Sequence, residues 1–258
     1  KNTKNAAATR TSRPSAASSR PRIEPMFHTI RQEQLEYLTA DALEGSIHCF
    51  STRYGGVSEG YLSSLNLGTH RGDNPENVYE NYRILGRAIG FAPKNLVLTR
   101  QIHSDIVRRV GRAEAGAGLF RPDLEGCDGL ITNEPGIGLV AFAADCTPVL
   151  LWDPETGAVG AVHAGWRGTA NRIAAKAVRA MTDAFGTRPE HLRAAIGPNI
   201  GPCCFETDAD VPEAILASVG PAAKPWIRVR PGGKFDVDLK SVNRLILEQA
   251  GVRHIDVS

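Results

Sequence analysis

The segment "GAVGAVHAGWRGTANRIAAKAVRAMTDAFG", residues 157–186, joins a strand pattern directly to a helix pattern. Its first eight residues form a short apolar run with glycines, which is typical of a buried strand. A helix is expected to begin near Thr169 and to end at Gly186. One face of this helix is apolar and carries Ile173, Ala177, Met181 and Phe185. Between the two elements, "HAGWRG" places a histidine, two glycines and an arginine at one end of a strand.

The rest of the chain alternates strand patterns with helix patterns in mixed order. Strands are expected at residues 45–53, 95–103, 128–132, 136–153 (as one strand or two), 157–164 and 192–197. Further helices are expected over 74–90, 211–220 and 236–251, the first with Asn74 as its N-cap and Gly90 as its stop. Neighbouring strands that read as hairpins favour an α+β fold, a single compact layered domain with mixed β-sheets flanked by helices.

Composition excludes several classes of protein. The 258 residues carry a net charge of +2, so no strong field indicates binding to nucleic acid or to an acidic membrane. No apolar run reaches the roughly 18 residues of a membrane span, and no secretory signal is expected because no basic segment followed by an apolar one opens the sequence. The five cysteines are an odd number in a chain of ordinary size, which favours free thiols in a reducing cytoplasm.

The two ends of the chain are expected to differ from its middle. Residues 1–22 contain only basic charges and no apolar residue larger than alanine, so we expect a disordered arm. Residues 23–258 are then expected to form one catalytic domain. The final "RHIDVS" has the pattern of a strand that is beginning, and we expect a C-terminal segment to be missing from this sequence.

Three residues could form a metal site. His103 ends the expected strand in "RQIHSDIV", Cys146 lies within "AADCTPVLL", and His163 ends the strand before "AGWRG". Their spacing matches no zinc-finger pattern, but two imidazoles and one thiolate would leave one tetrahedral position open, as in a catalytic zinc site. The residues alone leave the alternative open that the histidines are polar strand ends and the cysteine a small core residue.

The loop after His163 could bind an anion. Gly165 and Gly168 allow the backbone to approach a ligand closely, Arg167 adds a forked cation, and the helix expected at Thr169 offers free N–H groups. The competing interpretation is a tight turn with Trp166 in the core and Arg167 in solvent.

Two further loops contain candidate residues. Residues 51–78 form a long Gly/Ser/Asn-rich segment with Arg53 and Asn66, and long ordered loops are often functional. The rigid loop "IGPNIGPCCFE" at 196–206 holds the adjacent Cys203 and Cys204, a poor geometry for chelating one metal or for a disulfide. We expect these two thiols to be packed in the protein.

Five segments in this order resemble the YfiH/YlmD family: "STRYGGVSEGYLSSLNLG", "RQIHSDIV", "AADCTPVLL", "AVHAGWRGT" and "IGPNIGPCCFE". This family is also called the laccase-domain or polyphenol oxidase family, and its members are described as purine nucleoside phosphorylases. The resemblance covers about residues 45–257. It implies a layered α/β domain with mixed sheets and a zinc site at His103, Cys146 and His163. Members usually end in a Phe-Ser-Tyr-Arg-Arg-like motif, which this chain lacks.

The resemblance also implies an activity. Members are described as cleaving adenosine, inosine and S-methyl-5'-thioadenosine with phosphate, and as deaminating adenosine. On this basis Arg53, Asn66, Arg167 and Thr169 are expected to bind substrate or phosphate. Asp145 is expected to shuttle a proton or to orient a ligand histidine, and Asp128 is a weaker candidate for such a role. Zinc is favoured over copper, and a monomer over an oligomer.

Three other functions remain as alternatives. A copper-dependent polyphenol oxidase is disfavoured because the seven histidines include no His-x-His pair, and Met26 and Met181 are poorly placed as axial ligands of a blue-copper site. An amidase that edits a peptidoglycan precursor could use Cys146 as nucleophile and His163 as base, or zinc. A non-catalytic zinc-stabilised binding module would close the fourth metal position with Cys127 or Cys204.

Overall fold

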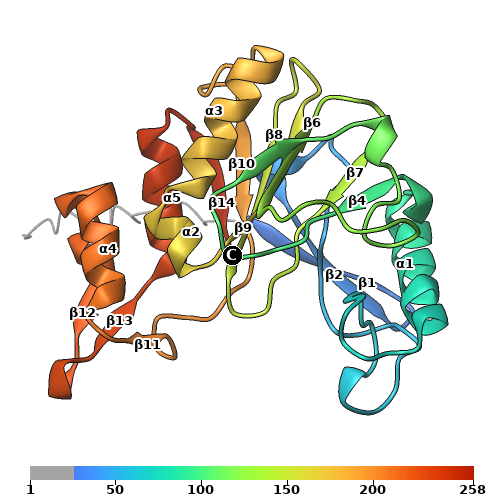
Figure 1. The fold of residues 1–258 in the computed structure, drawn as a ribbon, viewed down its shortest axis with the longest axis horizontal. Coiled ribbons are helices and arrows are strands. Elements are labelled where there is room, and N and C mark those ends of the chain that lie inside the picture. The colour runs from blue at the N-terminus through green and yellow to red at the C-terminus, as the bar shows by residue number, and fades with distance from the viewer. Residues whose placement is uncertain (1–25) are drawn as a thin grey trace, which may run out of the picture.

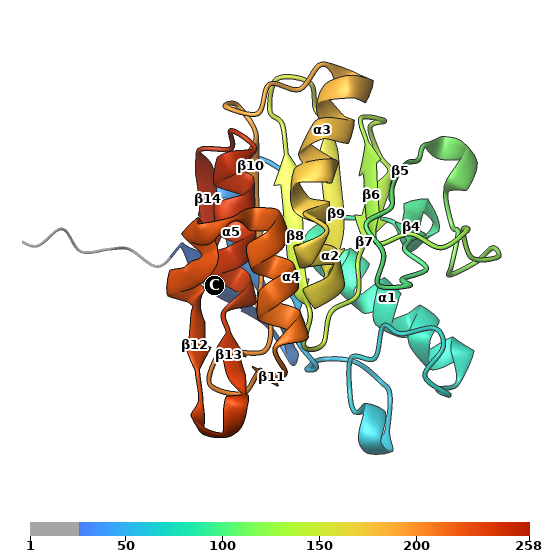
Figure 2. The same ribbon diagram turned by 60° about the vertical axis from the view of Figure 1, so that its left-hand side comes forward.

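The computed structural model of the chain describes residues 26–258, and the arm expected at residues 1–22 lies outside the described part. A mixed six-stranded sheet forms its centre, in the order β14-β10-β8-β9-β6-β5 (Figures 1 and 2). Its strands are β5 (Val107–Arg109), β6 (Gly129–Thr132), β8 (Thr147–Trp152), β9 (Val159–Ala164), β10 (Arg193–Ile196) and β14 (His254–Val257). The β6–β9, β9–β8 and β8–β10 pairs are antiparallel, whereas β5–β6 and β10–β14 are parallel.

Three smaller sheets surround this centre. The first contains β1 (Phe27–Gln32), β2 (Leu35–Ala40) and β3 (Phe50–Ser51), and the second pairs β4 (Leu96–Leu98) with β7 (Gly138–Val140). The third contains β11 (Glu206–Thr207), β12 (Ile227–Val229) and β13 (Phe235–Val237). Together with the helices they confirm the predicted α+β class, a single layered domain with mixed sheets.

The five α-helices of residues 26–258 are α1 (Pro75–Ile89), α2 (Trp166–Ala170), α3 (Ile173–Phe185), α4 (Asp210–Val219) and α5 (Leu239–Gln249). All except α1 lie on one side of the central sheet. Helix α3 lies against β5, β6 and β9, and α5 lies against β10 and β14. Helix α1 is at the opposite side of the molecule, beside β4 (Figure 1). The largest buried cluster lies between the sheet and α3, α4 and α5, and includes Met181 and Ile246.

The predicted signals of α1 are confirmed. The Asn74 side chain accepts a hydrogen bond from the Glu76 amide, Pro75 is the first helical residue, and Gly90 ends the helix with φ of 76°. A bound polar cap and a left-handed glycine satisfy the free backbone groups of both ends. No helix among residues 26–258 has the length and apolarity needed to cross a membrane.

The prediction that one helix begins near Thr169 is wrong. Two helices occupy this region: α2 begins at Trp166, and α3 begins at Ile173 after a break at Arg172, which has φ of 59°. A left-handed residue interrupts the hydrogen-bond ladder of a helix. The strand expected over 95–103 is also shorter, because β4 ends at Leu98, and His103 therefore lies in a loop.

We predict that Met181→Ala lowers the free energy of unfolding by about 2–5 kcal/mol, because a fully buried side chain would leave a cavity between α3 and the sheet. Arg179→Ala is the matched control on the exposed face of the same helix, where it removes only a surface ion pair with Asp183. Urea unfolding followed by circular dichroism measures both changes. Equal stability of the two variants would contradict the position of the core.

Candidate metal centre

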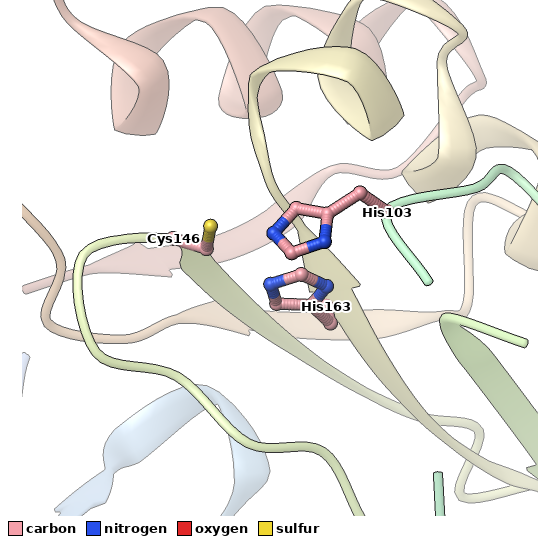
Figure 3. A group of neighbouring side chains, drawn as sticks. All are labelled: His103, Cys146 and His163. Atoms are coloured by element: carbon pink, nitrogen blue, oxygen red, sulfur yellow. The ribbon is translucent and has the colours of Figure 1, made fainter. Parts of the chain in front are cut away.

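Three side chains from separate segments meet at one end of the central sheet. His103 lies in the loop after β4, Cys146 directly precedes β8, and His163 is in β9. Strands β8 and β9 are antiparallel neighbours with Thr147 opposite Ala164, which brings Cys146 beside the end of β9. One ligand atom from each of the three residues lies within 4.8 Å of the other two (Figure 3).

The donor set fits a metal ion. Atoms bound at about 2.0–2.3 Å to a tetrahedral ion lie about 3.3–3.8 Å apart, so shifts of about 1 Å would complete the coordination. His103 is exposed, Cys146 is half-buried and His163 is buried, so the cluster opens to solvent on the side of His103. In Figure 3 one nitrogen of each imidazole faces the side of the Cys146 sulfur.

The carboxylate of Asp128 connects both histidines. This side chain is fully buried, and its Oδ1 contacts Nδ1 of His163 at 2.8 Å and accepts the His103 amide at 3.0 Å. Its Oδ2 accepts bonds from the amides of Ile102 and Ser104, at 3.2 and 2.7 Å, and from the Ser104 hydroxyl at 2.7 Å. One carboxylate therefore fixes the loop of one histidine and the ring of the other.

This arrangement determines which nitrogen of His163 is free. A carboxylate at Nδ1 holds the proton on that nitrogen and leaves the lone pair of Nε2 for a metal. The same carboxylate supports His103, whose φ of 58° lies in the left-handed region that non-glycine residues rarely adopt. A backbone in this region persists where the surrounding contacts fix it, as the hydrogen bonds to Asp128 do here.

The pKa shifts of Asp128 and His163 indicate that these two side chains form a buried ion pair. Burial by itself raises the pKa of Asp128. Its hydrogen bonds with His163 and with residues 102–104 lower the pKa by more than burial raises it, so the net value is about 2. Burial lowers the pKa of His163, but hydrogen bonds with Asp128 and Cys146 raise it to about 9. At neutral pH the imidazole therefore carries a second proton, on Nε2, which a metal must displace before it can bind the lone pair of that nitrogen.

Gly165 packs against all three candidate ligands. A Cβ atom at this position would lie 3.1 Å from the Cys146 sulfur, 3.2 Å from Cδ2 of His103 and 3.7 Å from Cε1 of His163. The first two distances are tighter than ordinary van der Waals contact, so a side chain here would push the ligands apart. This packing role was missed at the sequence level, where Gly165 was expected only to let the backbone approach a ligand.

Thr169 does not have the role expected of it. The side chain is fully buried, its hydroxyl accepts a bond from Asn243, and its amide donates to the carbonyl of Gly165 within α2. Neither polar group is available to phosphate, which corrects the expectation that Thr169 binds the anion. Arg167 is exposed, with its guanidinium 4.2 Å from the centroid of the Trp166 ring, a cation–π contact that leaves its N–H groups accessible.

Arg53 and Asn66 stabilise their own loop. Arg53 donates from Nε to the carbonyl of Ser63 at 2.9 Å, and Asn66 donates to the Asp73 carboxylate at 2.9 Å. Within residues 26–258 neither side chain has a hydrogen bond to the candidate ligands. Asp145 is exposed beside Cys146, and its carbonyl accepts the amide of Ile200 at 3.0 Å. Its carboxylate remains a candidate for proton transfer.

Neither cysteine proposed to close the fourth position belongs to the cluster. Among the described residues, one group of His, Cys, Asp or Glu side chains is close enough to share an ion, and it consists of His103, Cys146 and His163. Cys127 is buried next to Asp128, and Cys204 is exposed on another loop. Asp128, named from the sequence as a weaker proton shuttle, instead orients the ligands; its place directly before the buried strand β6 was the available signal.

The chain is similar to proteins of known sequence and structure. Residues 47–258 match the model of a family described as multi-copper polyphenol oxidoreductase laccase. "Purine nucleoside phosphorylase YlmD" of Geobacillus stearothermophilus is 38% identical over 224 residues, covering 85% of this chain and 81% of that protein. "Purine nucleoside phosphorylase" of Deinococcus radiodurans is 40% identical over 211 residues, covering 82% and 78%. The crystal structure of YlmD from Geobacillus stearothermophilus superposes with a TM-score of 0.85 at 35% identity, covering 91% and 88%.

We predict that Asp128→Asn weakens zinc affinity by about 10–100-fold, because the amide cannot accept all the donors that face the carboxylate. Asp153→Asn is the matched control: Asp153 is also buried and accepts bonds from Glu155 and Thr156, but it lies at the far end of β8. Competition with a chromophoric chelator measures both affinities. An equal loss in the two variants would show a general effect of removing a buried charge.

Gly165→Ala is expected to reduce zinc affinity at least about tenfold, a typical size for disturbed ligand orientation, while leaving the fold intact. Gly160→Ala in β9, the strand that ends directly before Gly165, is the control, because its Cβ would remain in ordinary contact, 3.4 Å from Leu151 and Met181. The same chelator competition, together with thermal unfolding, checks the result. Unchanged affinity in Gly165→Ala would contradict the packing argument.

Proposed function

The chain belongs to the family described as multi-copper polyphenol oxidoreductase laccase, and we propose that it is a zinc-dependent purine nucleoside phosphorylase within this family. Relatives named purine nucleoside phosphorylase, aligned over more than four fifths of the chain, support the activity. The observation that carries the proposal is the open cluster of two imidazoles and one thiolate around His103, Cys146 and His163. A zinc ion bound there would supply Lewis acidity at its fourth position.

The proposed substrates are adenosine, inosine and S-methyl-5'-thioadenosine. In phosphorolysis a phosphate oxygen bonds to the anomeric carbon of the ribose, and the bond from that carbon to the purine nitrogen breaks. The base leaves with a proton, and the sugar is released as its 1-phosphate. Adenosine deamination is proposed as a second activity of the same site, in which water replaces the amino group and ammonia leaves.

The chain's own residues have separate roles in this proposal. Arg167, exposed one residue after Trp166 and close in sequence to His163, binds the phosphate through charge-assisted hydrogen bonds. Arg53 and Asn66 are proposed to contact substrate from their loop, after giving up some of the contacts described above. Asp145 is proposed to deliver the proton to the leaving base, because its carboxylate is exposed directly beside Cys146.

Multi-copper chemistry, which the family description names, does not suit the donors of this chain. Such an oxidase needs several groups of histidines. Among the described residues there is one cluster of metal-type ligands, and it contains two histidines. Four other histidines have polar partners elsewhere: His28 with Asp41, His48 with Ala40, His70 with Asp123 and His191 with Glu155. These contacts lie in different parts of the fold, so the histidines are not arranged for a second metal group.

One observation favours a thiol hydrolase as a second candidate. His163 lies between Cys146 and Asp128 and interacts with both. The nucleophile, base and orienting acid of cysteine amidases are arranged in the same order. The position of His103 argues for the metal site instead, because such a triad has no use for a second imidazole within 4.8 Å. Activity toward amide substrates after complete removal of metal would support the thiol mechanism.

We also propose that residues 23–258 act as one catalytic unit, as a monomer in the cytoplasm. The five free cysteines, none paired in a disulfide among the described residues, support a reducing compartment. Neither nucleic acid nor a membrane is proposed as a partner, in keeping with the small net charge of +2.

We predict that zinc-loaded protein converts inosine to hypoxanthine and ribose 1-phosphate only when phosphate is present, and adenosine to inosine without it. Chromatography of the products checks both reactions. Arg167→Ala is expected to raise the KM for phosphate about tenfold or more, the effect of one lost charge-assisted hydrogen bond, without slowing deamination. Arg179→Ala, an exposed arginine on α3, is the control.

Absence of both products with a full complement of zinc would contradict this function and remove the nucleosides as substrates. Phosphorolysis that persists unchanged in Arg167→Ala would contradict only the role of Arg167 and would assign the phosphate to other residues.

A further inference from the structure

The adjacent cysteines of the loop between β10 and β11 are both exposed. This corrects the expectation that Cys203 and Cys204 are packed in the protein. Their sulfur atoms lie 3.2 Å apart and therefore point the same way. Two thiols at this distance on the surface have no role in the function proposed above.

The backbone of this loop holds the two thiols in place. The amides of Cys204 and Phe205 both donate to the carbonyl of Gly201, at 3.0 and 3.1 Å, which closes a tight turn around Cys203. The preceding Ile200 is bonded to the carbonyl of Asp145, which ties the loop to the segment before β8. A ligand that binds both sulfurs therefore meets groups that are already ordered, which reduces the entropic cost of binding.

The pair is separate from the candidate metal centre. In the described part of the chain the metal-type cluster consists of His103, Cys146 and His163, and neither Cys203 nor Cys204 is close enough to join it. A ligand of the pair would therefore be held by two sulfur atoms alone on the protein side.

The distance between the sulfurs favours one bridging atom over a disulfide. Adjacent Cα atoms across a trans peptide are about 3.8 Å apart, less than the roughly 4.4 Å at which unstrained disulfides begin. An atom bonded to both sulfurs at about 2.3 Å, the length of a metal–thiolate bond, would have an S–X–S angle of about 90° at the observed separation. Zinc usually takes three or four protein ligands, and among the described residues no group of three His, Cys, Asp or Glu donors includes these two thiols. A pyramidal trivalent centre, which forms angles close to 90°, fits without rearrangement.

Protonation of the pair is consistent with such a ligand. The hydrogen bond with Cys203 raises the pKa of Cys204, and the nearby Arg230 only partly opposes it. The raised pKa keeps the Cys204 thiol protonated at neutral pH, so a ligand that takes up thiol protons as it binds has an advantage over one that requires two thiolates.

We propose that Cys203 and Cys204 form a two-thiol binding site for trivalent arsenicals and chemically similar trivalent, thiophilic centres. With an organic arsenoxide, two As–S bonds form, the arsenic–oxygen bond breaks, and the oxygen leaves as one water molecule with both thiol protons. Arsenic remains trivalent throughout, so the reaction needs neither an oxidant nor a reductant.

The test uses the full, zinc-loaded chain and one equivalent of phenylarsine oxide. Intact-mass spectrometry should show one added phenylarsenic group, with two fewer titratable thiols and zinc retained. Excess 1,2-ethanedithiol should reverse the adduct. Cys203→Ser and Cys204→Ser should each weaken binding about 100-fold or more, because one As–S bond replaces two.

Controls distinguish this site from the other thiols. Cys49→Ser and Cys146→Ser should each retain the adduct, since neither residue lies in the loop. Loss of the adduct in Cys146→Ser would assign it to the metal centre and overturn the proposal, as would full binding by Cys204→Ser. Loss of two thiols without a gain of phenylarsenic would show oxidation to a disulfide, which also contradicts the bridging geometry.

Discussion

The buried carboxylate of Asp128 is the contact on which the candidate centre depends. It forms a hydrogen bond with the ring of His163 and accepts hydrogen bonds from the backbone amides of residues 102–104. His103 and His163, two candidate ligands from distant segments, are therefore held by one carboxylate. An isolated buried carboxylate would be strongly unfavourable, and the surrounding donors offset that cost. The candidate metal centre is thus preorganised by a charge that does not itself belong to the donor cluster.

The fold supplies the remaining precision. Antiparallel pairing of β8 with β9 places Cys146 beside the end of the strand that carries His163, and these strands lie in the middle of the central sheet. Gly165 follows at once and leaves only enough room for the three ligands. Helix α3 packs against β9, and the largest buried cluster includes Val162 and Ala164 at the end of that strand. The site is exposed mainly through His103, whose loop is the part held by Asp128.

Local patterns in the sequence predicted the α+β class and several of the elements, and together with the family resemblance they predicted the three candidate ligands that the fold brings within 4.8 Å of one another. The cap and stop of α1, the strand before His163 and the mixed order of elements all depend on neighbouring residues. The break at Arg172 could not be read in this way, because the residues around it favour a helix and tertiary packing decides the conformation. The hydroxyl of Thr169 accepts a hydrogen bond from Asn243, which lies 74 positions away in the chain. The role of Asp128 likewise requires knowing which distant amides face it.

The proposed centre binds a single divalent ion through His103, Cys146 and His163. X-ray absorption spectroscopy at the metal edge of the zinc-loaded protein tests it most directly. The account predicts one sulfur at about 2.3 Å and two imidazole nitrogens at about 2.0–2.1 Å, with one further light atom. A shell without sulfur, or with two or more sulfurs, would show that the ion is bound elsewhere and would contradict the account.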